Sequence, residues 1–492
     1  MKKIEKILIL LFIIYKLFLV FIMWSGRNVP PEPDDSYSYI SEIKKVAFSK
    51  EIFPDYLGSH RGSSNYTKYL PFTLGISIVS WLTGLNIDFL YFFNFIFGTI
   101  ILAFAINFFL KSIISDKILY ILSFLMFVLY NGNGAYHGFY WVVPTFYSFL
   151  LFLLILGMVF KKQTNYLILA LLTMLFILVH PISIYALSIF IFYLFFNLIF
   201  KKQLKRKVVL RTLFVILFGI LFFFLANLLF KKYNNNSAFS SNNPDSIKMT
   251  IAYQITKNAV PKDVEKITWG RLIIYKNSWE NFLREYYHIL FPNIIFLLIF
   301  IIFSIRTFFQ DKRIIFIYFA CLFFSLVSLL HPQGQRSLLF LWPVTFLLIG
   351  HFLKILWDDL KKYNKIFFYL CFLFLALFAT YNNLHWIFYM KNHNNFVWDK
   401  QCAISLFNLV KDEEVIFYDN KMSFSSFHSQ GLFQKKSLAI HTYKHLLQNK
   451  IEPKVDYLVV SSGERPQNIY IKPGVDLNLI MDCGYYKVYQ II

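Results

Sequence analysis

The chain begins MKKIEKILILLFIIYKLFLVFIMWSGRNVPPEPDDSYSYI (residues 1–40), which joins a basic start, a long apolar run and a pair of acids. The apolar run reaches Trp24 and no small-residue cleavage site follows it, so the sequence predicts an uncleaved membrane anchor. Lys16 interrupts this run. Because a lysine at the centre of a spanning helix costs about 2.5–3.5 kcal/mol on insertion scales, we expect Lys16 to face other helices or to extend toward the interface. A functional role for Lys16 is the less favoured alternative.

The composition of the whole chain is that of a membrane protein. Of its 492 residues, 57% are hydrophobic and 15% are charged, whereas soluble domains contain about 25% charged residues. The net charge of +22 is divided among short basic runs between apolar stretches, a pattern that orients proteins in membranes. This distribution argues against nucleic acid as a partner.

Eleven apolar stretches are candidates for membrane-spanning helices, each of which needs about 20 apolar residues. The expected spans are roughly 4–24, 87–110, 117–130, 139–160, 165–180, 181–200, 208–230, 289–309, 313–330, 337–353 and 366–388. A further apolar stretch, 69–84, is shorter and is interrupted by Pro71 and two glycines.

The positions of Lys and Arg indicate which loops face the cytoplasm. If 69–84 does not cross, the inner segments contain 19 Lys or Arg in 45 residues, whereas the outer loop 25–70 contains 6 in 46 and the outer turn 131–138 contains none. This asymmetry follows the positive-inside rule and predicts a cytoplasmic N-terminus. A crossing at 69–84 would place the basic run 201–207 outside, so we expect a juxtamembrane or re-entrant helix there.

The sequence predicts two domains. Residues 1–388 form a multispan helical domain with outer loops 25–70 and 231–288, and residues 389–492 form a small extracytoplasmic α/β domain. The tail contains the strand-like runs EVIFYD (414–419), SLAIH (437–441) and DYLVVSS (456–462), and the helix-like run TYKHLLQNK (442–450).

Asp34 and Asp35 are the strongest candidates for chemistry. An ionised aspartate costs a few kcal/mol in hydrocarbon, so we expect the pair at or beyond the interface, where the prolines before it stiffen the chain. The apolar residues after the pair have the spacing of one helix face, which predicts a helix with the acids at its N-terminus. One acid would act as a general base or bind a divalent cation such as Mg or Mn. The alternative is a purely structural pair, one capping the helix and the other solvated; Glu32 is a weaker third candidate.

Two histidines and one arginine lie in predicted outer turns. His180 and His331 each precede a proline, which ends a helix, and both fall at the membrane level of the acid pair. Arg336 is the only cation in its outer turn, and a guanidinium there can hold a phosphate through two hydrogen bonds. The alternatives are ordinary turns and an arginine that meets lipid headgroups.

Weaker candidates lie elsewhere on the predicted outer face. Arg61, in the predicted outer loop 25–70, could likewise either hold a phosphate or meet lipid headgroups. His137 lies on a glycine-rich turn beside aromatic residues that can stack on a sugar, and Glu285 lies just before a predicted span. Each is also explained as an ordinary interfacial residue. In the tail, Cys402 and Cys483 could form a disulfide in an oxidising compartment.

This arrangement resembles the GT-C glycosyltransferases, a class that includes protein O-mannosyltransferases, aminoarabinose transferases and oligosaccharyltransferase catalytic subunits. The shared features are one span, a first outer loop that opens on paired acids, a juxtamembrane helix, about ten further spans and a small outer domain. The resemblance implies that Asp34 and Asp35 correspond to the family's loop acids, and that Arg336 and Arg61 could hold the donor phosphate. Several members carry an acid at the outer end of the 139–160 span, where this chain has His137 instead.

The resemblance also implies a function. A polyprenyl-phosphate donor would supply a hexosyl or pentosyl group to a glycan, lipid or protein acceptor, with inversion, at the outer face of a bacterial inner membrane. The competing classes are a transporter or flippase of lipid-linked glycans and a non-catalytic envelope-polymer assembly protein. Transporters carry ionisable residues near the bilayer midplane, and Lys16 is the feature that favours this alternative.

Overall fold

The architecture comes from a computed structural model of the full chain. It describes residues 2–24, 43, 47, 70–129, 144–161, 165–179, 183, 187, 190–191, 206–234, 266–269, 272–275, 340, 342–360, 365–393, 415–418, 457–461, 476–482 and 486–492.

Long helices make up most of these residues, as the apolar stretches predict. They are α1 (Lys2–Trp24), α3 (Leu70–Thr83), α4 (Ile87–Ile113), α5 (Lys117–Leu129), α6 (Pro144–Phe160), α7 (Tyr166–Val179), α10 (Arg206–Asn234), α15 (Trp342–Leu360) and α16 (Lys365–His393). Eight helices coincide with predicted spans, and α3 coincides with 69–84. α15 begins five residues later than predicted because Pro343 occupies its first turn, where the missing N–H is not needed.

Two helices in the described part are long and apolar enough to cross a membrane, Phe89–Ile113 and Lys365–His385. The shorter apolar helices are Leu74–Thr83, Lys117–Leu129, Thr145–Phe160, Tyr166–Val179 and Val209–Phe222. The predicted spans 289–309 and 313–330, and most of 181–200, lie outside the described residues. The total of eleven spans therefore stays a prediction.

The chain divides into two compact units. The bundle unit consists of Met1–Ile22 and Phe95–Phe388, and the second unit consists of Met23–Asn94 and Tyr389–Ile492. α4 contributes residues to both.

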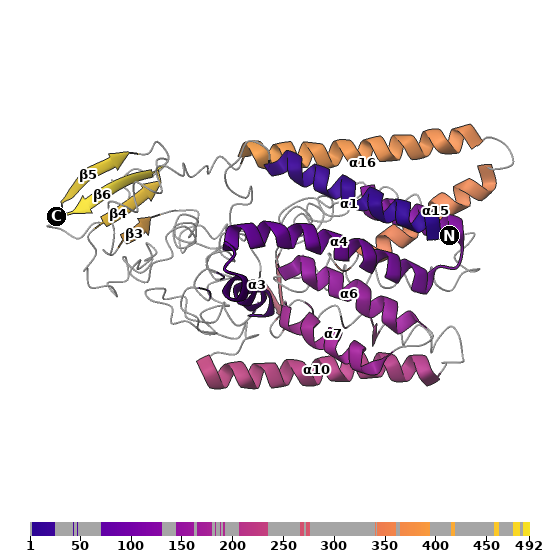
Figure 1. The fold of residues 1–492 in the computed structure, drawn as a ribbon, viewed down its shortest axis with the longest axis horizontal. Coiled ribbons are helices and arrows are strands. Elements are labelled where there is room, and N and C mark those ends of the chain that lie inside the picture. Colours follow the sequence, from indigo (N-terminus) through magenta and orange to yellow (C-terminus); the bar gives the residue numbers. More distant parts are fainter. Residues whose placement is uncertain are drawn as a thin grey trace. The chain divides into compact units, whose positions relative to one another are not determined.

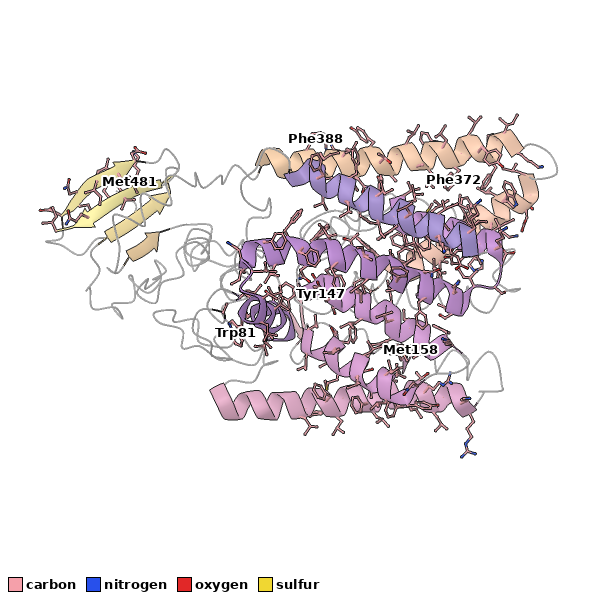
Figure 2. The ribbon with its side chains drawn as sticks, in the orientation of Figure 1. Trp81, Tyr147, Met158, Phe372, Phe388 and Met481 are labelled. Carbon is pink, nitrogen blue, oxygen red and sulfur yellow. The ribbon has the colours of Figure 1, made fainter. Side chains whose placement is uncertain are left out.

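The first helix shows how the bundle unit is built. One face of α1 is exposed and wholly apolar, with Ile7, Leu10, Ile14, Phe18 and Phe21. The opposite face is buried and contains both charges of the helix interior, with Glu5, Leu8, Phe12, Lys16 and Leu19. α16 likewise exposes apolar side chains along its length, of which Phe388 is labelled in Figure 2. Apolar residues outside and polar residues inside are the arrangement that lipid requires.

Within the bundle unit the helices lie side by side (Figure 1). α1 lies along α16, α15 packs on α5, and α6, α7 and α10 follow one another. A continuous core of aromatic and aliphatic side chains joins α1, α4, α5, α6, α7, α10, α15 and α16.

Glycines allow four close helix contacts. A Cβ at each would come too near a side chain of a neighbouring segment: Gly98 to Phe146, Gly157 to Phe108, Gly219 to Leu187 and Gly350 to Ser123. At Gly157 the separation would be 2.6 Å, which carbon atoms do not tolerate. Since lipid gives no hydrophobic drive to join helices, close backbone approach through small residues supplies much of the attraction.

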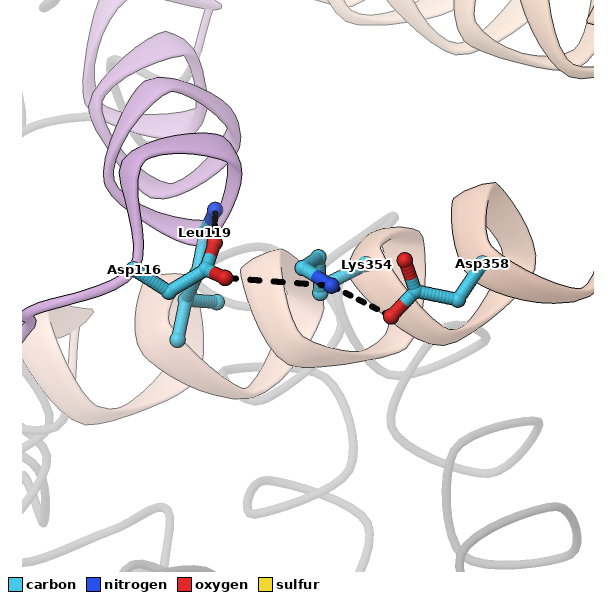
Figure 3. A network of polar contacts seen from close by, with 4 residues as sticks. All are labelled: Asp116, Leu119, Lys354 and Asp358. Atoms are coloured by element: carbon cyan, nitrogen blue, oxygen red, sulfur yellow. Dashed lines mark hydrogen bonds and ion pairs between the residues drawn. The ribbon is translucent and has the colours of Figure 1, made fainter. Parts of the chain in front are cut away.

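A polar network fixes the turn between α4 and α5 against α15 (Figure 3). Asp116 accepts a hydrogen bond from the backbone N–H of Leu119 at 2.8 Å, which caps the start of α5. Lys354 of α15 lies 3.9 Å from the other carboxylate oxygen of Asp116 and pairs with Asp358 one turn along its own helix. The carboxylates are about half exposed, so these pairs contribute at most about 1 kcal/mol each.

Further charged contacts lie at this same end of the bundle unit, hereafter the charged end. Glu5 near the start of α1 pairs with Lys111 near the end of α4 at 2.6 Å. The guanidinium of Arg211 in α10 donates to the carbonyl of Lys161, where α6 ends, and so satisfies a carbonyl that the helix itself cannot. α1, α5 and α10 therefore begin, and α4, α6 and α15 end, at the charged end.

In the second unit, α3 is closed by a glycine. Gly84 has φ of +68°, the left-handed conformation that commonly ends helices, and its N–H bonds the carbonyl of Ser80 at 2.8 Å. At about 1.5 Å per residue, the 14 residues of α3 extend about 21 Å, less than the roughly 30 Å hydrocarbon core. The expectation that 69–84 does not cross stays a prediction.

The second unit also contains a four-stranded mixed sheet. Its strands are β3 (Val415–Tyr418), β4 (Tyr457–Ser461), β5 (Leu477–Asp482) and β6 (Tyr486–Ile491), in the order β3-β4-β6-β5. β3 is parallel to β4, whereas β6 is antiparallel to both β4 and β5. The runs 414–419 and 456–462 are confirmed as strands, whereas β5 and β6 were not predicted. The runs 437–441 and 442–450 lie outside the described residues, in the crossover that a parallel pair requires.

A short hairpin lies in the predicted outer loop 231–288, where no strand was expected. β1 (Lys266–Trp269) pairs antiparallel with β2 (Leu272–Tyr275), with Trp269 opposite Leu272. The register leaves two residues to make the turn, and a two-residue connection that starts with glycine is typical of tight hairpins.

Gly350→Ala should destabilise the protein by about 1–3 kcal/mol, because the new methyl group would meet the side chain and backbone of Ser123. Thermal unfolding in detergent would measure the change. Gly75→Ala in α3 is the matched control, since nothing lies within 4 Å of its Cβ position. Adding Ser123→Ala should restore part of the loss by removing the nearest atom. Equal unfolding temperatures for Gly350→Ala and Gly75→Ala would contradict the close contact of α5 and α15.

Candidate functional site

The candidate residues of the sequence lie outside the part of the chain that the structure describes. They are Asp34, Asp35, Arg61, His137, His180, Glu285, His331 and Arg336. Their roles stay predictions. The described segments nearest to them in the sequence can be located, each within its own unit.

The segment that follows the acid pair packs on α3 within the second unit. Ile43 and Ala47, four residues apart, are both helical. The hydroxyl of Ser77 donates to the Ile43 carbonyl at 3.0 Å, and the indole N–H of Trp81 donates to the Ala47 carbonyl at 2.9 Å. Both donors are themselves four residues apart, so the two segments run alongside in the same direction. The helix predicted after Asp35 is thus confirmed at these two positions, and α3 supports it.

The start of α6 lies against the segment that follows His180. The hydroxyls of Ser148 and Ser183 share a buried hydrogen bond of 2.6 Å. Ser183 is three residues beyond His180, and Ser148 lies in the second turn of α6, which follows the glycine-rich turn of His137. The bond therefore joins the two chain segments next to these histidines.

An aromatic anchor follows Arg336. Phe340 is fully buried, and its ring contacts Phe152 of α6 at 4.9 Å and Phe176 of α7 at 5.8 Å between centroids. Arg336 itself, four residues earlier in the sequence, lies outside the described residues. The three rings join the start of the segment before α15 to α6 and α7.

A polar node joins α1, α5 and α16 inside the bundle unit. The amide of Asn383 donates to the carbonyl of Leu129, the last residue of α5, at 2.7 Å and to the Tyr15 hydroxyl at 3.1 Å. The Tyr15 hydroxyl in turn donates to Thr380 at 3.2 Å. Terminal carbonyls have no partner within their own helix, and leaving one in hydrocarbon costs several kcal/mol. Asn383 therefore allows α5 to end inside the bundle.

Ring contacts set the relative alignment of α1, α5 and α15. Phe12 of α1 meets Phe124 of α5 at 6.5 Å, and Phe127 of α5 meets Phe346 of α15 at 4.6 Å. Because α1 and α5 both begin at the charged end, Lys16 lies one turn beyond Phe12 at the level where α5 ends. α15 begins at this level too, six residues after Arg336. We call this level of the bundle unit the loop end.

Lys16 is buried at the loop end. Its exposed fraction is 3%, and its ammonium group lies 5.2 Å from the ring centre of Phe12. Of the two favoured sequence alternatives, burial among helices is confirmed and extension to the interface is wrong. A cation over an aromatic face gains up to about 2 kcal/mol when desolvated.

No cluster of three or more His, Cys, Asp or Glu that could hold a metal occurs among the described residues. The carboxylates that could bind a divalent cation, Asp34 and Asp35, lie outside them, as do Cys402 and Cys483. Cys371 in α16 is a free, half-buried thiol. The sequence analysis also missed Asn383 and Phe340, although the polar pair in TYNNLHW (380–386), close after an apolar stretch, was a visible signal for the first.

Neither a sequence family nor a curated protein matches the chain. Solved structures do resemble it. The Archaeoglobus fulgidus oligosaccharyltransferase AglB, in complex with an inhibitory peptide and a dolichol-phosphate, matches with a TM-score of 0.56 and 10% identity over 92% of this chain and 69% of that chain. The same enzyme tethered to an acceptor peptide matches with a TM-score of 0.57 over 92% and 68%.

A second neighbour matches over nearly its full length. ArnT from Cupriavidus metallidurans, in the apo state, aligns with a TM-score of 0.55 and 11% identity, covering 98% of this chain and 97% of that chain. ArnT is an aminoarabinose transferase, and both neighbours are GT-C glycosyltransferases. At this identity the likeness concerns the fold, so the chain has the GT-C fold of integral membrane proteins. The apolar exposed faces of α1 and α16 agree with a location in a membrane.

Asn383→Leu should lower the free energy of unfolding by about 1–3 kcal/mol, because it leaves the Leu129 carbonyl and the Tyr15 hydroxyl without the amide that both now use. Hydrogen bonds in membrane bundles average nearer 0.6 kcal/mol, so a change at the upper end of this range would identify the capping role. Tyr381→Leu, at an exposed position of α16, is the control. Unfolding temperatures that fall equally in both variants would contradict the assignment.

Proposed function

Because the chain has the GT-C fold, we propose that it is a membrane glycosyltransferase that moves a sugar from a lipid-linked donor to an extracytoplasmic acceptor. The observation that carries this proposal is the nearly full-length match to ArnT, in which neither chain has a large part that the other lacks. A different reaction on this fold would require a separate catalytic site, which the described residues do not contain.

The donor we propose is a sugar linked to a polyprenyl phosphate. AglB has been captured with a dolichol-phosphate, which is a lipid of this kind. A lipid donor also gives a physical reason for a catalyst inside a bilayer, since the prenyl tail remains in hydrocarbon while the phosphate lies at the interface. Membrane lipid is therefore both the solvent of the enzyme and the source of its substrate.

We infer the class of the acceptor from what the two neighbours bind or transfer. AglB has been captured with an acceptor peptide that contains a sequon, whereas ArnT transfers aminoarabinose. We propose an acceptor hydroxyl or amide on a lipid, glycan or protein outside the cytoplasm, and a hexosyl or pentosyl group as the transferred unit.

The residues proposed for the reaction are those of the first outer loop and the outer turns. Asp34 or Asp35 would remove the acceptor proton as a general base, with inversion at the sugar carbon. Arg336 would stabilise the phosphate leaving group. The proposed substrate-binding residues beyond these are His331, His180, Arg61, His137 and Glu285.

Asp34 and Asp35 are also the proposed ligands of a divalent cation. Carboxylate oxygens are the ligands that Mg²⁺ and Mn²⁺ prefer, and an AglB structure was solved with zinc and sulfate. A bound cation would supply positive charge beside the donor phosphate. 

The proposal includes an orientation. The N-terminus would lie in the cytoplasm of a bacterial cell and the tail 389–492 outside its inner membrane. The charged end of the bundle, with its exposed lysines and aspartates, would then face the cytoplasm, as the positive-inside rule expects.

Substituting Asp34 and Asp35 singly with Asn tests the catalytic assignment. At least one variant should lose transfer by a factor of about 10² or more, measured in vesicles that carry a defined polyprenyl-linked sugar and an outer acceptor. Asp359→Asn, at the charged end, is the control for a lost aspartate. Both variants should remain in the membrane at normal levels. Full transfer by both would show that the acids only shape the loop.

Chelation tests the cation separately. EDTA should abolish transfer, and excess Mg²⁺ or Mn²⁺ should restore it, because the carboxylates would otherwise face the donor phosphate without an intervening positive charge. Added Mg²⁺ or Mn²⁺ should not restore transfer in the Asp34→Asn or Asp35→Asn variant. Transfer that continues after exhaustive chelation would contradict the metal role and leave the base role intact.

A further inference from the structure

Three exposed cations lie at the charged end, where α6 ends and where α7 and α10 begin. Lys161 follows the last residue of α6, and Arg206 and Lys207 are the first two residues of α10. The side chains of all three are exposed. We call these three residues the cationic corner.

Contacts within the bundle unit hold the cationic corner together. Arg211 is buried, and its guanidinium donates to the Lys161 carbonyl and, at 3.4 Å, to the hydroxyl of Tyr166 at the start of α7. Lys207 precedes Arg211 by four residues, so it lies about 6 Å away along α10 and on the same face. The Lys161 ammonium group lies 5.4 Å from the ring centre of Phe108 in α4. The corner therefore rests on packed helices.

The cationic corner has no carboxylate in its own part of the sequence to balance it. The chain contains no Asp or Glu from residue 117 to residue 244, a range that includes α5, α6, α7 and α10. Among the residues that the structure describes, none of the three cations forms an ion pair, whereas Lys111 and Lys354 at the same end each pair with a carboxylate. The corner is therefore complementary to an anion from outside the chain.

An exposed apolar surface extends from the corner along α7 and α10, which lie side by side (Figure 1). Its side chains are Leu167, Ile168 and Leu171 of α7 and Leu210, Leu213 and Leu217 of α10. At the start of the two helices the rings of Tyr166 and Phe214 lie 5.9 Å apart. The surface is thus continuous across both helices.

The position of Arg206 connects the charge to this apolar surface. The three leucines of α10 follow Arg206 at intervals of four, three and four residues, so all four side chains lie on one face of the helix. From Arg206 to Leu217 this face extends about 16 Å, which is close to half of the roughly 30 Å hydrocarbon core. A cation thus lies at one end of an apolar face as long as one leaflet is deep.

We propose that the cationic corner binds the headgroup of an anionic phospholipid, whose acyl chains lie along the exposed apolar surface of α7 and α10. Ammonium and guanidinium groups both form charge-assisted hydrogen bonds with phosphate oxygens. Basic sites between membrane helices bind anionic headgroups in this way. The inference goes beyond the proposed function, because it does not require transfer activity.

A general orienting role is the alternative explanation of these cations. The positive-inside rule requires only that Lys and Arg remain on one side of the membrane, so it makes all exposed cations of the charged end equivalent. A lipid site makes the cationic corner different from the others. Lys3, Lys6 and Lys117 are exposed at the same end and provide the matched comparison.

Lipid binding to the full-length protein in detergent, measured by native mass spectrometry, tests the proposal. The probes are phosphatidylglycerol and phosphatidylcholine with identical acyl chains, of which only the first has a net negative charge. Wild type should bind phosphatidylglycerol about tenfold or more tightly than phosphatidylcholine. The triple variant Lys161→Gln, Arg206→Gln, Lys207→Gln should lose most of this preference. Equal affinity of wild type for the two lipids would overturn the proposal.

The control changes the net charge by the same amount at another place. The triple variant Lys3→Gln, Lys6→Gln, Lys117→Gln should retain the preference for phosphatidylglycerol. Equal losses in the two triple variants would show that binding follows net charge alone, and an unchanged preference in the corner variant would show that the corner binds no lipid. Either result contradicts the proposal.

Two further measurements distinguish a lipid site from a site for a soluble phosphate and from a structural role. Glycerophosphoglycerol, the headgroup without acyl chains, should bind about tenfold or more weakly than the whole lipid, because it cannot contact the apolar surface. Equal binding of the two would overturn the lipid assignment. The variant Lys161→Arg, Lys207→Arg keeps both charges and should keep the preference; loss of the preference in this variant would contradict recognition by charge.

Discussion

The bundle depends on one constraint: a polar group that leaves water is costly unless it finds a partner inside the protein. In α1, Glu5 and Lys16 are buried and an apolar face is exposed. At the end of α5, the carbonyl of Leu129 accepts a hydrogen bond from the amide of Asn383 in α16. The same constraint explains why Arg211 reaches the carbonyl at the end of α6. In hydrocarbon an unmet backbone group costs several kcal/mol, which exceeds the value of the exposed ion pairs at the charged end. These internal partners therefore shape the bundle more than its surface charges do.

The two ends of the bundle unit differ in chemistry, and this difference connects the fold to the proposed function. Among the described residues, one end pairs acids with lysines, whereas the level at which α5 ends contains the buried Lys16 and the polar node of Tyr15, Thr380 and Asn383. The fold resembles that of two membrane glycosyltransferases, AglB and ArnT.

The sequence predicts the helices well because apolar runs of sufficient length have few alternatives in a membrane. It also identifies Ile43 and Ala47 as one helix face, and it reads 415–418 and 457–461 as strands. It misses β5 and β6, in which the alternation of apolar and polar residues is short. It also misses the hairpin at 266–275, whose signal is a single glycine between two β-rich runs. The partners of Phe340 and Asn383 could not be predicted, because they lie more than 150 residues away, although the polar pair at 382–383 marks Asn383 itself. The acid pair, the histidines and Arg336 come from sequence reasoning alone.

The glycines at the helix contacts have a mechanical consequence. Where Gly157 receives Phe108 and Gly350 receives Ser123, a helix that slid or rotated by one residue would drive a side chain into a neighbour's side chain. These contacts therefore fix the register of the helices, and the bundle would serve as a stationary frame. A bundle held in one register contrasts with carriers that rock one half of a bundle against the other.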